Sequence, residues 1–102
     1  MVARVAMFEG INVEEAQKSM PEADAIISEL VEPLPGYQGE LGLATMDGKF
    51  ISITFFDSAE NAQGAEETFD KVMPEKLGHI FETWGGRRTS VDRYEVVSEL
   101  RR

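Results

Sequence analysis

Residues 35–62 constrain the fold most, because they predict a β-hairpin followed by the start of a helix. Two runs with alternating apolar residues, 37–46 and 50–56, flank the dipeptide Asp47-Gly48. Asp-Gly between such runs is typical of a tight hairpin turn, since glycine readily adopts the positive φ that mirror-image turns require. We therefore expect two antiparallel strands joined by a two-residue Asp47-Gly48 turn. A connection this short excludes a parallel arrangement of the two strands.

The residues before this hairpin predict a strand and a long amphipathic helix. Residues 2–8 form a nearly continuous apolar run, which is typical of a central strand. Asn12 with Glu15 three residues later predicts a helix N-terminus, and apolar residues then recur at spacings of three and four. Pro21 lies inside this stripe, so we expect it to kink or split the helix near residues 19–20.

The residues after the hairpin predict a second helical region and a last strand. Ser58 is the expected N-cap of the second helix, and Pro74 should break this helix or begin another helical turn. Residues 91–97 alternate between apolar and polar side chains and predict the last strand. The predicted order is that of an α+β, ferredoxin-like βαββαβ domain, with a four-stranded antiparallel sheet and helices on one face. We expect residues 1–102 to form one such domain.

The third strand predicts a partner, because neither of its faces is strongly polar. A strand that is apolar on both faces is normally covered on both faces. The helices of this chain can cover only one face, so we expect a second copy of the chain to cover the other. The two alternating sets are Phe50, Ser52, Thr54 and Phe56 on one face, and Ile51, Ile53 and Phe55 on the other.

Composition narrows the class of protein. The chain has no cysteine, which excludes disulfides and thiolate ligands, and it has no apolar run of the roughly 20 residues that a membrane helix needs. Its net charge of -9 opposes binding to nucleic acid, whose phosphates would repel it. The single histidine, His79, has no second histidine or cysteine at ligand spacing. We expect a cytoplasmic protein without a metal or cofactor that binds neither nucleic acid nor membranes.

Two segments and the element order resemble the antibiotic-biosynthesis-monooxygenase-like (ABM-like) family of the dimeric α+β barrel superfamily. Members typically show a Pro-Gly-aromatic turn before the second strand. They also show a strand ending in an aromatic residue, followed by an acid and a serine, before the second helix. The resemblance extends over nearly the whole chain and implies a homodimer whose two sheets pack face to face. The matching segments are Pro35-Gly36-Tyr37-Gln38-Gly39 and residues 53–62, ITFFDSAENA.

The resemblance also implies oxygenase chemistry as a first hypothesis. The family includes cofactor-free monooxygenases of polycyclic phenols and haem-degrading monooxygenases. The haem-degrading members use an asparagine on the first strand, a tryptophan in the second helix and a later histidine. In this chain the first strand has no asparagine, and the other two positions fall near Ala65 and Glu75. The phenol-oxidising members use asparagine, tryptophan and arginine, and this chain has these residue types at unmatched positions, Asn61, Trp84 and Arg87.

Side-chain types suggest a candidate site in a cleft between the sheet and the helices. His79 titrates near neutral pH and could move a proton, while Arg87 could stabilise a phenolate or an oxyanion. The structural alternative is that His79 is a surface residue, Arg87 follows a Gly-Gly turn, and the aromatic residues pack in the core or an interface. The candidate ligand-binding residues are Tyr37, Phe55, Phe69 and Trp84, with Met73 beside them.

Three functions remain open at this point. The first is a small dimeric, cofactor-independent oxygenase that acts on an aromatic or polyphenolic small molecule. The second is a dimeric module without catalytic activity that binds a small ligand or has a structural role, which the lack of a convincing acid–base pair favours. The third is haem binding through His79. The polar side chains in a cavity between sheet and helices would distinguish these functions.

Overall fold

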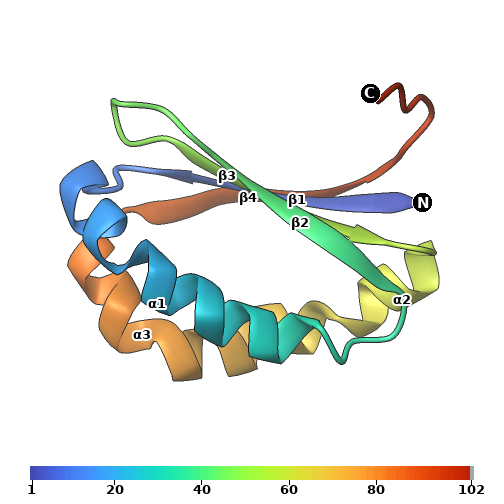
Figure 1. The fold of residues 1–102 in the computed structure, drawn as a ribbon, viewed down its shortest axis with the longest axis horizontal. Coiled ribbons are helices and arrows are strands. Elements are labelled where there is room, and N and C mark those ends of the chain that lie inside the picture. The colour runs from blue at the N-terminus through green and yellow to red at the C-terminus, as the bar shows by residue number, and fades with distance from the viewer. Residues whose placement is uncertain (102) are drawn as a thin grey trace.

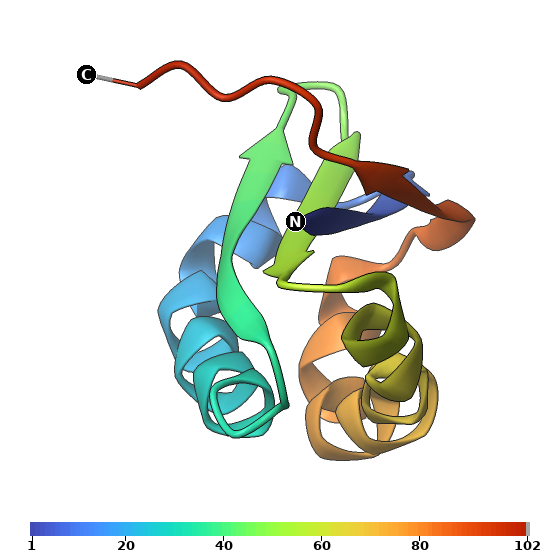
Figure 2. The ribbon, with the colours of Figure 1, turned by 90° about the vertical axis from the view of Figure 1, so that its right-hand side faces the viewer.

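All helices lie on one face of a four-stranded antiparallel sheet (Figure 1). The computed structural model describes residues 1–101. The strands are arranged in the order β2-β3-β1-β4, which confirms the predicted ferredoxin-like α+β fold. Figure 2 shows α1 beneath β2 and the second helical region beneath β4. The elements are β1 (Val2–Glu9), α1 (Val13–Val31), β2 (Tyr37–Ala44), β3 (Phe50–Phe56), α2 (Ala59–Gly64), the π-helical turn η1 (Thr68–Val72), α3 (Met73–Trp84) and β4 (Arg87–Glu95).

The predicted helix starts are confirmed by their capping hydrogen bonds. The backbone N–H of Glu15 donates to Asn12 Oδ1 at 3.1 Å, and that of Asn61 donates to Ser58 Oγ at 3.1 Å. Each bond satisfies one of the backbone donors that the first turn of a helix leaves free. None of the described helices is both long enough and apolar enough to cross a membrane.

Of the two outcomes predicted for Pro21, a kink or a split, the split is wrong, because α1 runs without interruption from Val13 to Val31. Proline removes one backbone donor, which leaves the carbonyl of Gln17 without its usual partner. Both Gln17 and Pro21 are exposed, so this carbonyl remains close to solvent. The loss of one hydrogen bond at the surface is compatible with a helix that buries its other face.

The hairpin is confirmed, but its loop is longer than the predicted two-residue turn. The backbone N–H of Thr45 donates to the carbonyl of Lys49 at 3.0 Å, so the turn inside this bonded pair has three residues, 46–48. Gly48 has a φ of 94°, and a Cβ there would lie 2.7 Å from the carbonyl oxygen of Ile11. Glycine is therefore required both by its backbone conformation and by the close approach of the chain that follows β1.

A β-bulge near the start of β2 corrects the predicted alternation of that strand. Tyr37 lies opposite Phe56, whereas Gly39 lies opposite Phe55, so the register shifts between Tyr37 and Gly39. The extra residue moves the Tyr37 side chain to the helix-facing side, where its ring meets Phe56 at 6.5 Å between centroids. Strict alternation from Tyr37 would place Leu41 and Leu43 on the same face as Tyr37, whereas in the structure they face away from the helices.

The hydrogen-bonding pattern of the second helical region changes just before Pro74. The backbone N–H of Met73 donates to the carbonyl of Thr68, five residues earlier, which is a π-type bond. Pro74 lies in the first turn of α3, where its missing donor is tolerated. The last strand also begins earlier than predicted, at Arg87 rather than at residue 91, because it pairs with the far end of β1.

The two faces of the sheet have different environments. The helix-facing side holds the core, whose fully buried residues include Phe56, Val31 and Leu77. The opposite side, which we call the outer face, has no helix over it (Figure 1). Ile51, Ile53 and Phe55 lie on the outer face. Of the two alternating sets of β3 residues, this is therefore the set that faces away from the helices. The exposed apolar residues of the outer face are Met7, Leu41, Leu43 and Tyr94.

Candidate functional site

A row of three small residues leaves a cleft between the sheet and the helices. Gly42 of β2, Ser52 of β3 and Ala6 of β1 lie side by side in the sheet register and all face the helices. Their side chains are too short to fill the space between the layers, which in a well-packed protein is normally filled. The resulting cavity has a volume of about 620 Å³. This is within the size range of small-molecule sites.

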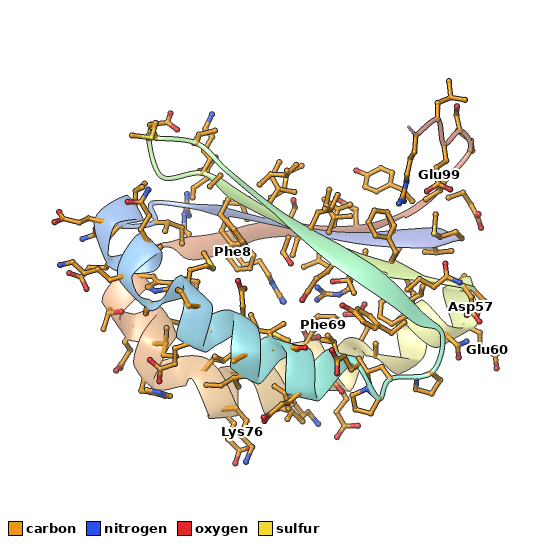
Figure 3. All side chains as sticks on the ribbon, in the orientation of Figure 1. Phe8, Asp57, Glu60, Phe69, Lys76 and Glu99 are labelled. Atoms are coloured by element: carbon orange, nitrogen blue, oxygen red, sulfur yellow. The ribbon has the colours of Figure 1, made fainter. Side chains whose placement is uncertain are left out.

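Aromatic and apolar side chains form most of the wall of this cleft. Phe8 and Phe50 stand next to each other, with ring centroids 6.1 Å apart, and the rings of Phe81 and Trp84 lie 5.2 Å apart. Phe69 adds a further ring from the π-helical turn, and Figure 3 shows Phe8 and Phe69 between the sheet and the helix layer. Offset and tilted rings of this kind suit contact with a flat aromatic ligand.

A polar row crosses the sheet next to the small residues. Glu40, Thr54, Arg4 and Arg93 are aligned across the four strands on the helix-facing side. Arg4 is only 3% exposed and lines the cleft. Its Nε donates to Glu66 Oε1 at 3.2 Å, and its guanidinium carbon lies 4.0 Å from the centre of the Phe69 ring. An ion pair and a stacked ring therefore fix the orientation of this buried cation.

Two arginines and one carboxylate stand at the β4 edge of the cleft. Arg88 donates from Nη1 to Asp70 Oδ1 at 3.0 Å, and Arg87 lines the same edge. Arg87, Arg88 and Asp70 are exposed, so the ion pair between Arg88 and Asp70 contributes little to stability. Asp70 belongs to the π-helical turn, which places it and Phe69 side by side at the cleft.

Two carboxylates stand at the opposite, β2 edge of the cleft. Glu40 comes from β2 and Asp24 from α1, and both line the cleft while remaining exposed. Partial desolvation, followed by the nearby negative charge of Asp24, raises the pKa of Glu40 above its ordinary value. A carboxyl group with a raised pKa in a cleft is a candidate proton acceptor, since it is more basic than a fully solvated carboxylate.

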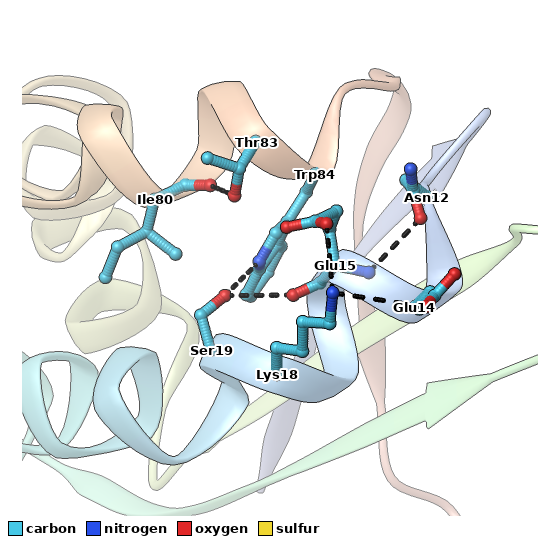
Figure 4. A network of polar contacts seen from close by, with 8 residues as sticks. All are labelled: Asn12, Glu14, Glu15, Lys18, Ser19, Ile80, Thr83 and Trp84. Carbon is cyan, nitrogen blue, oxygen red and sulfur yellow. Dashed lines mark hydrogen bonds and ion pairs between the residues drawn. The ribbon is translucent and has the colours of Figure 1, made fainter.

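Trp84 is held in the cleft wall by a chain of hydrogen bonds (Figure 4). Its indole Nε1 donates to Ser19 Oγ at 2.6 Å, and Ser19 Oγ donates in turn to the carbonyl of Glu15 at 3.1 Å. The backbone carbonyl of Trp84 accepts from the N–H of Asn12 at 2.7 Å. These contacts tie the end of α3 to the first turns of α1 and satisfy the polar atom of a buried indole.

The structure brings only some of the predicted site residues together. Phe69, Trp84 and Arg87 line the cleft, as does Met73. Tyr37 packs instead against Phe56 in the core, where desolvation, with smaller contributions from the charges of Glu40 and Glu32, raises its pKa. Phe55 lies on the outer face of the sheet, because side chains alternate along β3. His79, the only histidine of the chain, is exposed on α3 and does not line the cleft.

Sequence reasoning missed Arg4, Glu40 and Asp70 as cleft residues. One signal was available: Arg4 is a charged residue inside an apolar strand and has the same parity as Val2 and Ala6. No comparable signal marked Glu40 or Asp70, since both look like ordinary surface acids. Among residues 1–101, no group of three or more histidines, aspartates and glutamates is arranged to hold a metal ion.

The solved structures of other proteins show the same fold. A variant of SnoaB, a cofactor-independent oxygenase from Streptomyces nogalater, is similar with a TM-score of 0.67 at 12% identity, covering 97% of this chain and 95% of that one. The haem-degrader MhuD from Mycobacterium tuberculosis, with two haems bound in its active site, gives 0.63 at 20% identity, covering 98% and 99%. The chain shares its fold with these two proteins. The resemblance predicted from the sequence is thus confirmed as a likeness of fold.

A third solved structure concerns assembly. A dimeric ferredoxin-like protein from an uncultured marine organism is similar with a TM-score of 0.63 at 20% identity, covering 99% of this chain and 98% of that one. No protein-family model and no curated protein sequence matches this chain. At these identities the likeness identifies the architecture, and the chemistry has to be argued from the residues of the cleft.

Proposed function

We propose that this protein is a cofactor-independent oxygenase that oxidises a flat aromatic or polyphenolic small molecule in the cleft between sheet and helices. The observation that supports this most is the cleft itself, an apolar cavity of about 620 Å³ with aromatic walls and charged groups at its two edges. Cavities of this size and lining are the usual binding sites of small molecules. SnoaB, a cofactor-independent oxygenase, has the same fold over nearly its whole length.

The proposed reaction needs only the substrate and dioxygen. In an anthrone-type substrate, a ring CH₂ group becomes a carbonyl group. One atom of O₂ becomes the new carbonyl oxygen, and the other leaves as water with both hydrogens. The substrate supplies all four electrons that reduce O₂. Loss of one CH₂ proton gives an electron-rich enolate, which can react with O₂ directly. The protein then has three tasks, which are to bind the ring, accept the proton and stabilise the enolate oxygen.

Residues of the cleft suit these three tasks. Phe69 and Trp84 contact the ring, as the sequence suggested. Glu40 accepts the proton, because its raised pKa makes it a stronger base than a fully solvated carboxylate. Arg87 stabilises the negative oxygen from the opposite edge of the cleft. His79 has no part in this proposal, since it lies outside the cleft.

Oxygen uptake tests the proposal. The protein, without added flavin or metal, should consume one O₂ for each quinone formed from anthrone. The substitution Glu40→Gln should lower the rate by about 10²-fold to 10⁴-fold, as expected for loss of a general base. The matched control is Glu29→Gln, which removes the same charge from an exposed position of α1 outside the cleft. A panel of anthrones and polyphenols that gives no turnover above background would overturn the proposal.

One observation favours the second candidate, a ligand-binding module without catalytic activity. Glu40 and Arg87 belong to β2 and β4, the two edge strands of the sheet, so the proposed base and the proposed cation are far apart in the sheet. Trp84 is the only tryptophan of the chain and reports on ligand binding through its fluorescence. Quenching of this fluorescence by anthrone without any oxygen uptake would identify the binding module.

A homodimer is part of the same proposal. The outer face of the sheet presents contiguous apolar side chains from all four strands, including Leu41, which is 54% exposed. Contiguous exposed apolar surface is typical of an interface. The dimeric ferredoxin-like neighbour supports a second copy of this chain as the partner. In such a dimer the two clefts would lie on the outsides of the joined sheets.

A further inference from the structure

Arg4 has a buried hydrogen-bond donor without a partner. Its Nη2 is buried and has no hydrogen-bond partner among residues 1–101. Buried polar groups are paired in the great majority of cases, and leaving a charged group short of a hydrogen bond is costly. The same side chain lines the cleft. The side chain that carries this unused donor therefore lies in the wall of the cleft, where a ligand could supply the acceptor.

The neighbours of Arg4 hold its guanidinium in place without using Nη2. Glu66 accepts from Nε at 3.2 Å, and the Phe69 ring covers one face of the guanidinium at 4.0 Å. Asp70 Oδ1 is 3.9 Å from Nη2, which is too far for a hydrogen bond, and the same oxygen accepts from Arg88 Nη1 at 3.0 Å. The carboxylate of Asp70 is thus paired with Arg88 and leaves Nη2 of Arg4 without a hydrogen bond.

The local charge balance also leaves room for an anion. Arg4 and Arg88 are balanced by Glu66 and Asp70, and Arg87 adds one further positive charge at this edge. The acids of the cleft that remain, Glu40 and Asp24, come from β2 and α1 at the opposite edge. An additional negative oxygen is therefore favoured on the Arg4 side of the cleft.

We propose that Nη2 of Arg4 is an anion subsite in the wall of the cleft, which binds a carboxylate or ionised phenol oxygen of a planar aromatic ligand. The ring of this ligand lies along Phe69 and the aromatic wall, while its negative oxygen accepts the hydrogen bond from Arg4. This inference rests on the proposed function for its choice of the cleft as the ligand site. It narrows the ligand class to aromatic acids and acidic phenols, since Nη2 can only donate and a charged guanidinium forms its stronger hydrogen bonds with anionic oxygens.

A pair of ligands tests the subsite by fluorescence titration. Anthracene-2-carboxylate should bind about 10-fold to 100-fold more tightly than 2-(hydroxymethyl)anthracene, as expected for one charge-assisted hydrogen bond. The substitution Arg4→Met keeps the apolar contact with Phe69 and should abolish this preference without changing the affinity for the neutral ligand. Equal binding of the two ligands by the unmodified protein would overturn the inference, as would failure of both to bind.

Arg93→Gln is the matched control. Arg93 lies beside Arg4 in the same row of the sheet, carries the same charge, is exposed and does not line the cleft. The preference for the carboxylate should survive this substitution. If Arg93→Gln removes the preference as fully as Arg4→Met does, the preference arises from general surface charge, and the subsite is refuted.

Salt dependence tests the subsite in the unmodified protein, in case Arg4→Met does not fold. At about 1 M salt the Debye length is about 3 Å, so attraction by the exposed Arg87 and Arg88 is screened, whereas a buried contact is screened much less. A preference that persists supports Arg4, and one that disappears overturns the inference. Loss of preference with the neutral ligand still bound leaves the oxygenase proposal intact. If the preference for the carboxylate is retained but no oxygen is consumed, the oxygenase proposal is refuted and the anion subsite at Arg4 is supported.

Discussion

Two buried polar atoms in adjacent positions of the sheet have no hydrogen-bond partner among residues 1–101. They are Nη2 of Arg4 and Oγ1 of Thr54, which lie opposite each other on β1 and β3. Each such group lowers stability, because it has lost its hydrogen bonds to water and gained none in return. Natural proteins tolerate this mainly where function benefits. The polar row of the sheet is therefore the place where stability and ligand binding should conflict.

The substitution Thr54→Val should stabilise the protein. Valine has the shape of threonine without the hydroxyl, so the buried atom that lacks a partner is removed and the packing is kept. We expect the free energy of unfolding to rise by about 1 kcal/mol, measured by urea denaturation at one fixed protein concentration. The control is Thr83→Val. The hydroxyl of Thr83 donates to the carbonyl of Ile80 at 2.7 Å, so its removal should not raise the free energy of unfolding. A loss of stability in Thr54→Val would contradict the prediction.

The raised pKa of Glu40 predicts a pH dependence of stability with a definite sign. Because the folded protein binds this proton more tightly than the unfolded chain, the associated stability is present below the ordinary glutamate pKa of about 4.3. It is lost as the pH rises through the interval up to the raised pKa. The gain in stability of Glu40→Gln over the unmodified protein should therefore be larger at about pH 7 than at about pH 4.

Thermal unfolding at the two pH values measures this gain. Glu29→Gln, which removes a charge from an exposed site outside the cleft, corrects for the general effect of one fewer acid. The prediction fails if the difference between Glu40→Gln and the unmodified protein is the same at both pH values.

At the scale of elements, the sequence predicted what is local and missed what depends on register. The caps at Asn12 and Ser58 and the hairpin follow from short motifs whose physical effects are confined to a few residues. The cleft depends on Gly42, Ser52 and Ala6, which come from three strands and become neighbours only through strand pairing. The bulge after Tyr37 changes which residues face the helices, and no local rule located it.

Filling the cleft from β3 should separate folding from ligand binding. Ser52→Leu adds an apolar side chain that points into a cavity of about 620 Å³, so the fold should be retained with equal or greater stability. The same side chain occupies the space of the ligand, and we expect the affinity for 2-(hydroxymethyl)anthracene to fall at least about 10-fold. Trp84 fluorescence measures the affinity. The matched control, Ser52→Ala, leaves the cleft open and should keep the affinity of the unmodified protein. Unchanged binding by Ser52→Leu would show that the ligand binds outside the cleft.

At the scale of the whole molecule, the sheet separates the candidate site from the proposed interface. The cleft lies on the helix-facing side, and the outer face is apolar and has no helix over it (Figure 1). This division also explains why only some of the residues predicted for the site line the cleft. Phe55 and Phe69 both looked like aromatic ligand contacts in the sequence, yet β-strand alternation turns Phe55 to the outer face. Side-chain type alone does not tell which of the two layers a residue will face.

The homodimer gives the last prediction, and Ile53 is the residue that tests it. Ile53 lies in the middle of the outer face, between Val5 of β1 and Leu41 of β2. If two outer faces pack together, the interface should bury upwards of about 2,000 Å² in total, and a charge at its centre would have to be desolvated without a partner. The unmodified protein should therefore sediment as a dimer at micromolar concentration, and Ile53→Lys should sediment as a monomer. Met46→Lys is the control, because Met46 is 88% exposed in the hairpin loop, beyond the apolar rows of the sheet. A monomeric unmodified protein would contradict the dimer, and a dimeric Ile53→Lys would move the interface away from the outer face.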